Sequence, residues 1–241
     1  MHAATRIDVL SIDVPEAEHG LAMIDAATGR IVIAVATTAH PMRQRSSIAH
    51  ELGHVVAGDL DRETPLMPGE RSPTEICADA FARYLLLPLE AVHRRLPEGA
   101  TGVSLSDLSA LVQEFEVSPA LAAIQLRTAG KIDAETCAQW TKHSAKHLAT
   151  TFGWLSQYRS LAADSAIPHA PQSLMTRAVE GYQRGVLGIT ELAAWYGQEP
   201  AALEEEIGVP QRVQESEEWV DQWDEAAPLF PGSTAEGEPA S

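Results

Sequence analysis

The sequence of 241 residues is poor in basic side chains, with 17 Lys and Arg against 34 Asp and Glu, which gives a formal net charge of −17. Affinity for nucleic acid or anionic lipid comes from clustered positive charge, so this balance argues against a general phosphate-backbone binder. The acidity is concentrated, because residues 199–241 carry 12 acidic side chains and a single basic one. The exclusion of nucleic acid is therefore weaker for the body of the chain than for the whole.

Cysteine and long apolar runs are also scarce. The two cysteines, Cys77 and Cys137, cannot form a framework of several disulfides, and neither belongs to a CxxC pair. No apolar run approaches the length of a membrane span, and the first residues lack the apolar core of a signal peptide. We therefore expect a cytoplasmic protein with reduced thiols and no membrane association.

The first part of the chain predicts strands followed by two helices. Two apolar segments, 20–25 and 30–35, flank a turn at 26–29 and predict a hairpin, with 30–35 as an edge strand. Helical spacing of apolar residues predicts a helix over 43–57 that ends at Gly58, and a second one over 75–87 capped by Ser72 or Thr74. Residues 59–71, between the helices, predict a loop. A small antiparallel sheet with two helices is an α+β arrangement.

Beyond a linker at 97–102 the pattern predicts helices alone. Their expected ranges are 107–117, 119–128, 135–163, 171–184, 190–196 and 200–207. Residues 214–241 are acidic and rich in small and polar side chains, so we expect a disordered tail there.

The segment His50-Glu51-Leu52-Gly53-His54 carries the most chemical information. On a helix, positions i and i+4 lie on one face, so both imidazoles can reach one metal ion. Glu51 lies one residue round the helix, close enough to act on a metal-bound water without being a ligand. The alternative is a pair of histidines held by hydrogen bonds in the core. The amphipathic helix directly after a strand favours the metal site.

A catalytic zinc ion usually takes three protein ligands, so a third is needed. The extended metzincin motif is excluded, because Ala57 and Leu60 stand where it requires Gly and His. Glu75 and Asp79 form an i, i+4 carboxylate pair on an otherwise apolar predicted helix and are the leading candidates. The competing third ligands are acidic residues of the intervening loop: Asp59, Asp61, Glu63 and Glu70.

This arrangement resembles the thermolysin-like gluzincins. In them a glutamate on a downstream helix binds zinc, and an aspartate four residues later accepts a hydrogen bond from the first histidine. The resemblance implies that Glu75 is the third ligand and that Asp79 fixes the orientation of His50. It also implies zincin-type active-site helices.

Residues 20–95 resemble one family within this class, the ImmA/IrrE metallopeptidases. The shared features are Arg43-Gln44-Arg45 before the HExxH helix, the pattern from Glu75 to Ala82, and the ending Leu85-Leu86-Leu87-Pro88. The resemblance implies an endopeptidase with one zinc ion per chain, although another divalent metal remains open. It implies a protein substrate, typically a helix-turn-helix repressor whose cleavage switches on stress or mobile-element genes. Glu51 would act as the general base.

The pattern along the chain and the resemblance together predict a domain organisation. We expect a zincin-like metallopeptidase domain over 1–98, a helix-turn-helix-like unit over 104–132, a helical region over 133–213 and the acidic tail over 214–241. The unit at 104–132 has few basic side chains, so a packed helical hairpin is favoured and direct DNA binding is not expected.

Two questions stay open at the level of sequence. Three residues are candidates for stabilising the oxyanion in the transition state, namely Tyr84, His93 and Tyr158. The alternative function is a non-proteolytic regulator that binds a transcription factor or DNA through its helical region. An intact Glu51 favours the enzyme, because a purely structural metal site has no need of a base.

Overall fold

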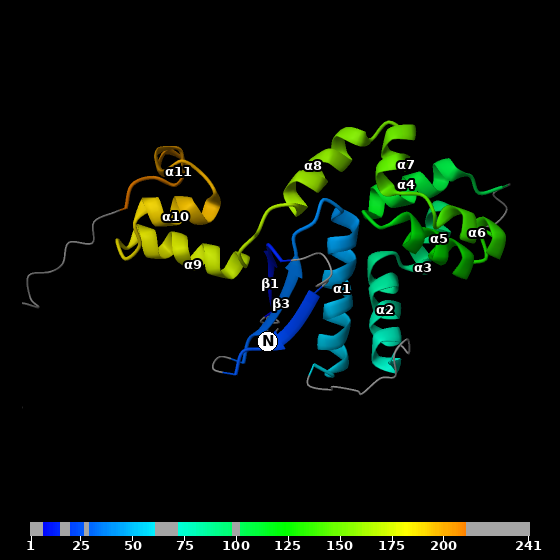
Figure 1. Ribbon diagram of the computed structural model, residues 1–241, viewed down its shortest axis with the longest axis horizontal. Coiled ribbons are helices and arrows are strands. Elements are labelled where there is room, and N and C mark those ends of the chain that lie inside the picture. The colour runs from blue at the N-terminus through cyan, green and yellow to red at the C-terminus, as the bar shows by residue number, and fades with distance from the viewer. Residues whose placement is uncertain (1–6, 15–19, 27–28, 61–71, 98–101, 211–241) are drawn as a thin grey trace, which may run out of the picture. The chain divides into compact units, whose positions relative to one another are not determined.

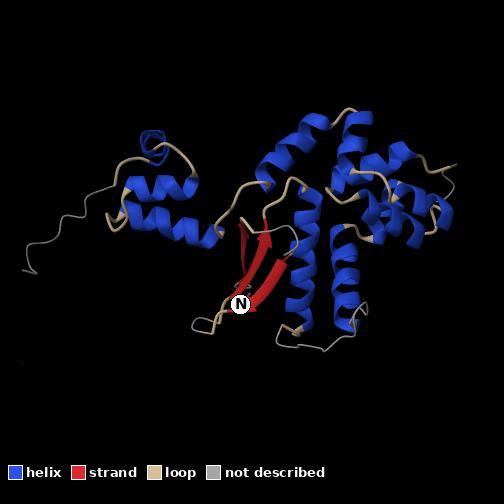
Figure 2. Ribbon diagram, viewed as in Figure 1, coloured by secondary structure: helices blue, strands red, loops and turns tan. Residues whose placement is uncertain are grey.

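The computed structural model describes residues 7–14, 20–26, 29–60, 72–97 and 102–210. Within these ranges, strands β1 (Ile7–Ile12), β2 (Gly20–Ile24) and β3 (Ile31–Ala36) precede the helices α1 to α11 (Figures 1 and 2). The predicted α+β class is confirmed. None of the helices in the described ranges is both long and apolar enough to cross a bilayer.

The sheet is mixed, with the strand order β1-β3-β2. Strand β1 runs parallel to β3, whereas β2 pairs antiparallel with β3 from Gly20↔Val35 to Ile24↔Ile31. The predicted hairpin is therefore present, but two predictions are wrong. The sheet is not purely antiparallel, and the segment at 30–35 is the central strand instead of an edge. The continuous apolar run of β3 is typical of a strand with a neighbour on each side, and Ile33 and Val35 are buried.

Helix α1 (Pro41–Ala57) covers one face of the sheet and α2 (Pro73–Leu86) packs on the other side of α1 (Figure 1). The apolar residues Ile48, Leu52 and Val55 of α1 pack against the buried side chains of the sheet. A Cβ atom built on Gly53 would lie 3.0 Å from Cα of Ala78, so glycine lets the two helices approach closely.

A second apolar core joins the end of α2 to a group of shorter helices. These are α3 (Leu89–Arg95), α4 (Leu105–Phe115), α5 (Pro119–Thr128), α6 (Ala134–Trp140), α7 (Ala145–Thr151) and α8 (Leu155–Ser165). The prediction of a single helix over 135–163 is wrong, because this segment is divided into α6, α7 and α8. The hydroxyl of Ser144 accepts the His147 N–H and begins α7, and Gly153 adopts a φ of 82° between α7 and α8.

The chain divides into two compact units, Met1–Met175 and Thr176–Ser241. The second unit has its own core of Ala178, Tyr182, Leu192, Ala193 and Leu203, formed by α9 (Gln172–Gln183), α10 (Ile189–Tyr196) and α11 (Pro200–Ile207). The predicted acidic tail at 214–241 lies outside the described residues, as do most of the predicted loop at 59–71 and of the linker at 97–102.

Candidate metal centre

The two histidines of the HExxH segment lie on one face of α1, as their spacing predicts. The Nε2 atoms of His50 and His54 are 3.1 Å apart, and the ring centroids are 4.9 Å apart in an edge-to-face arrangement. Helix α1 begins with Pro41 in its first turn and ends at Gly58, whose left-handed conformation caps the helix. The motif therefore lies on a regular helix whose opposite face is fixed against the sheet.

Glu75 joins the two histidines from α2. Its Oε2 atom lies 3.2 Å from Nε2 of His50, and its Oε1 atom lies 3.3 Å from Nε2 of His54. The hydroxyl of Ser72 accepts the Glu75 backbone N–H at 3.0 Å, so the N-cap of α2 fixes this residue in the first helical turn. The ligand atoms of the three residues all lie within 4.8 Å of one another. Two imidazoles and one carboxylate form the donor set of a catalytic zinc site.

Carboxylates hydrogen-bond to the other ring nitrogen of each histidine. Nδ1 of His50 lies 2.8 Å from Oδ1 of Asp79, and Nδ1 of His54 lies 3.0 Å from Oδ1 of Asp59. With the proton on Nδ1, each Nε2 atom keeps its lone pair for a metal ion. The residues present therefore fit a metal ion at the position where the two Nε2 atoms and Glu75 converge.

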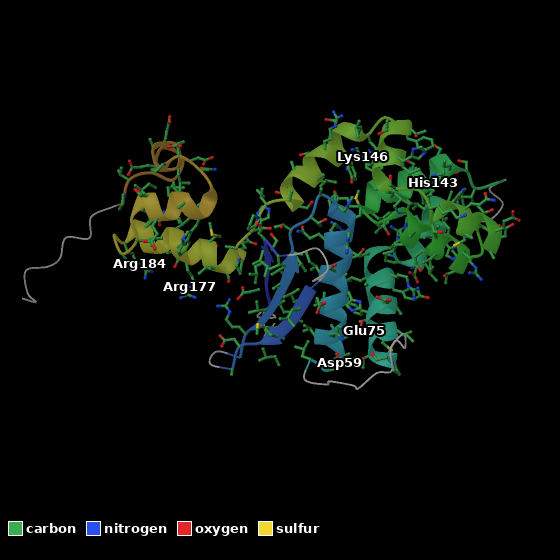
Figure 3. The ribbon with its side chains drawn as sticks, in the orientation of Figure 1. Asp59, Glu75, His143, Lys146, Arg177 and Arg184 are labelled. Carbon is green, nitrogen blue, oxygen red and sulfur yellow. The ribbon has the colours of Figure 1, made fainter. Side chains whose placement is uncertain are left out.

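The structure places one of the four competing third ligands, Asp59. Asp59 lies at Nδ1 of His54, on the side of the ring away from Glu75, whereas Asp61, Glu63 and Glu70 lie outside the described residues. Figure 3 labels Asp59 and Glu75 near the same end of the pair α1 and α2. Sequence reasoning missed the contact of Asp59 with His54. Gly58, which ends the helix, was the feature of the sequence from which this contact could have been predicted.

Glu51 faces a cavity of about 640 Å³ beside the histidines. Burial raises the pKa of its carboxyl group, although the nearby imidazoles and a hydrogen bond from the Ala22 backbone N–H act in the opposite direction. Several residues that line the cavity had no predicted functional role: Gly20, Leu21, Ala22, Ser46, Ser47 and Leu60. Arg43 also lines it. Glu51 thus lies between the histidines and strand β2.

The cavity wall includes none of the three predicted oxyanion candidates. Tyr84 is exposed, and the Tyr158 hydroxyl lies 3.5 Å from the carbonyl oxygen of Ala39, with a pKa raised by burial. Neither residue, nor His93, is among the described residues that line the cavity. The structure therefore does not bring these side chains to the candidate metal centre.

Gly20 provides the space in which the Glu51 carboxylate lies. A Cβ atom at Gly20 would be 2.9 Å from Oε1 of Glu51, closer than a methyl group allows. We expect Gly20→Ala to displace this carboxylate and to lower peptide cleavage by up to about 10²-fold, with the metal retained. The measurement is the cleavage rate together with the metal content. Gly188→Ala is the control, because a Cβ atom there meets nothing within 4 Å. A fully active Gly20→Ala variant would contradict the prediction.

Comparison with known families agrees with this site. Residues 4–127 match the Peptidase_M78 family model, described as the IrrE N-terminal-like domain. This match spans half of the chain and contains strands β1 to β3, the helix pair and the three candidate ligands. The chain belongs to the ImmA/IrrE metallopeptidase family, as the resemblance predicted. No curated protein matches the sequence.

Proposed function

We propose that this protein is a zinc-dependent endopeptidase that cleaves a transcriptional repressor or a similar regulator. The observation that carries the proposal is the convergence of His50, His54 and Glu75 at one point, with Glu51 beside it in a cavity. Family membership supports the peptidase activity. The arrangement provides ligands, a base and space for a substrate, which together are the parts of a metallopeptidase.

In this proposal Nε2 of His50, Nε2 of His54 and the Glu75 carboxylate hold the metal, one ion per chain. Zinc is the preferred ion for such donors, although other divalent metals fit them as well. A bound zinc ion is a Lewis acid that polarises the peptide carbonyl and makes water more acidic. Asp79 keeps the His50 ring oriented through its hydrogen bond to Nδ1.

Glu51 is the proposed general base. Its carboxylate accepts the proton of the attacking water and then passes it to the nitrogen of the leaving amine. Burial raises the pKa of this carboxyl group, which brings it closer to the working pH and favours both transfers. The hydrogen bond from the Ala22 N–H holds the carboxylate in place, and the missing Cβ of Gly20 leaves room for it.

Strand β2 is the proposed binding edge for the substrate backbone. The segment at 30–35, which was predicted as an edge strand, cannot take this role, because it is the central strand β3 and already has neighbours on both sides. Strand β2 is an edge, and its residues Gly20, Leu21 and Ala22 line the cavity. An edge strand has unpaired backbone groups, to which an extended peptide can add as a further strand.

The proposed substrate is a helix-turn-helix transcriptional regulator in the cytoplasm, cut to switch on stress or mobile-element genes. Support for this finer assignment comes from the resemblance described above, which implies such a regulator as the substrate, together with the family match. The alternative is a regulator that binds DNA or a transcription factor without cutting it. Its strongest candidate element is the helical pair α4 and α5.

The packing of α5 argues against DNA reading by this pair. Its residues Leu121, Ala122, Ala123 and Leu126 are buried in the core. Gln125 is 1% exposed, and its side-chain amide donates a hydrogen bond of 2.7 Å to the carbonyl oxygen of Leu87. A recognition helix must present its side chains to base edges, which these buried side chains cannot do. We therefore favour a structural role for α4 and α5.

Co-expression with the transcription regulator encoded beside the gene tests the substrate assignment. We expect the regulator to be shortened to discrete fragments, because an endopeptidase cuts at defined bonds. A chain carrying His54→Ala is the control and should leave the regulator intact. The measurement is the mass of the regulator and its fragments. A regulator that stays whole beside a metal-loaded peptidase would contradict this substrate.

A further inference from the structure

Asp59 is a buried carboxylate in contact with the second histidine of the candidate metal centre. We propose that it positions His54 for metal binding, as the counterpart of Asp79 at His50, and that the C-cap of α1 places it there. This inference rests on the proposed metal site. It concerns the ring nitrogen that faces away from the metal position, where Oδ1 of Asp59 lies 3.0 Å from Nδ1 of His54.

The end of α1 brings Asp59 back over the last helical turn. Gly58 has φ and ψ values of 68° and 36°, the left-handed conformation that glycine adopts without strain. The backbone N–H groups of Gly58 and Asp59 both donate to the carbonyl oxygen of His54, at 2.9 and 3.3 Å. Asp59 is five residues beyond His54, outside the i, i+4 spacing of a helix face. The reversal at Gly58 is therefore what brings its side chain to the ring.

The burial of Asp59 indicates a specific partner. Its side chain is 5% exposed, whereas that of Asp79 is 38% exposed. Removing a carboxylate from water is costly unless it is hydrogen-bonded, and the His54 ring supplies that hydrogen bond. The contact is also less accessible to water than the one between Asp79 and His50. We therefore expect Asp59 to matter at least as much for metal binding as Asp79.

The position of Asp59 suits orientation of the histidine and not ligation of the metal. Nε2 of His54, which faces Glu75, is on the other side of the ring. A neutral imidazole has one N–H group and one lone pair. A carboxylate at Nδ1 retains the proton there, so Nε2 keeps its lone pair for the metal. Without Asp59, the opposite tautomer would place a proton at the metal position and weaken binding.

Zinc affinity and histidine tautomer test the proposal in the full-length protein. We expect Asp59→Ala to weaken zinc binding by about 10- to 100-fold, measured by competition with a chromophoric chelator. Asp59→Asn should lose less zinc affinity, because its amide oxygen still accepts a hydrogen bond from Nδ1–H. In the metal-free protein, ¹⁵N NMR of the His54 ring should show the Nδ1–H tautomer, and Asp59→Ala should shift it towards Nε2–H. Asp79→Ala provides the comparison at His50.

Asp164→Ala is the matched control, since Asp164 is an exposed carboxylate 3.5 Å from His169 and outside the cavity. It should leave zinc affinity unchanged. Normal affinity and an unchanged tautomer in Asp59→Ala would overturn the proposal. Equal loss of zinc in Asp59→Asn and Asp59→Ala, with the Nδ1–H tautomer retained in both, would make Asp59 a ligand and also overturn it.

Two further results separate this inference from the proposed function. If Asp59→Ala fails to fold, the His54 tautomer is measured in the unaltered protein and in Asp59→Asn instead. An Nε2–H tautomer in these two proteins would overturn the proposal. If the unaltered protein binds no zinc, the proposed function fails. The NMR of the His54 ring then still reports on the hydrogen bond to Asp59, and an absent Nδ1–H tautomer would overturn the inference as well.

Discussion

Replacing Glu51 with glutamine is expected to retain the fold and the metal while lowering peptide cleavage by about 10²–10⁴-fold. The Glu51 carboxylate accepts a hydrogen bond from the Ala22 N–H and occupies space that a Cβ atom at Gly20 would fill, and Glu51 is not one of the three clustered ligands. An amide has nearly the same shape as a carboxylate but cannot accept the proton of the attacking water. The loss should therefore fall on the chemical step, measured as the turnover rate at saturating substrate.

The same variant separates a peptidase from a non-proteolytic regulator. In cells that carry Glu51→Gln, we expect the neighbouring genes to stay silent and the partner regulator to keep its full length on a gel. A binding protein would still switch these genes on, since it cuts nothing. Normal de-repression with an uncut partner would therefore overturn the peptidase proposal. Glu90→Gln, which changes an exposed carboxylate in the first turn of α3, is the control and should leave both outputs unchanged.

Loss of any one ligand should remove most of the metal. The unaltered protein is expected to contain one zinc ion per chain, and His50→Ala, His54→Ala and Glu75→Ala should each contain little. The Nε2 atoms and the Glu75 oxygens lie 3.1–3.3 Å apart across the site, so two remaining donors leave the coordination sphere incomplete. Elemental analysis of dialysed protein measures the metal content, and peptide cleavage should fall with it.

Glu90→Ala is the matched control for Glu75→Ala, because each residue is an acid in the first turn of its helix. It should retain the full metal content. A contrary result would be a Glu75→Ala variant with full occupancy beside an Asp59→Ala variant with none. That pattern would move the third ligand to Asp59 and would show that the hydrogen bond between Asp59 and His54 is replaced by coordination when metal is bound.

The local features of the candidate metal centre could be predicted from sequence because they depend on local geometry. The i, i+4 spacing of His50 and His54 places both rings on one face of any helix, whatever surrounds it. Ser72 and Gly58 mark helix ends through their own backbone preferences, and both predictions are confirmed as caps of α2 and α1. The hairpin of β2 and β3 follows in the same way from two apolar segments and a short turn.

Strand order could not be predicted, since it depends on contacts between distant segments. The apolar pattern predicted the strand at 30–35 but gave no information on its neighbours, so a central strand was taken for an edge. For the helix-turn-helix-like unit predicted over 104–132, the scarcity of basic side chains favoured a packed hairpin. In α5 the side chains of Leu121, Gln125 and Leu126 are buried.

The sequence by itself determined the donor types and the family, because these depend on residue identities and short spacings, and it predicted Glu51 as the base. Tertiary structure decided which carboxylate meets which nitrogen. The close approach at Gly53 and Ala78 sets the distance between α1 and α2, and so brings Glu75 to the Nε2 atoms. The turn at Gly58 directs Asp59 to Nδ1 of His54. Both results depend on differences of about an ångström in packing, which residue types alone do not specify.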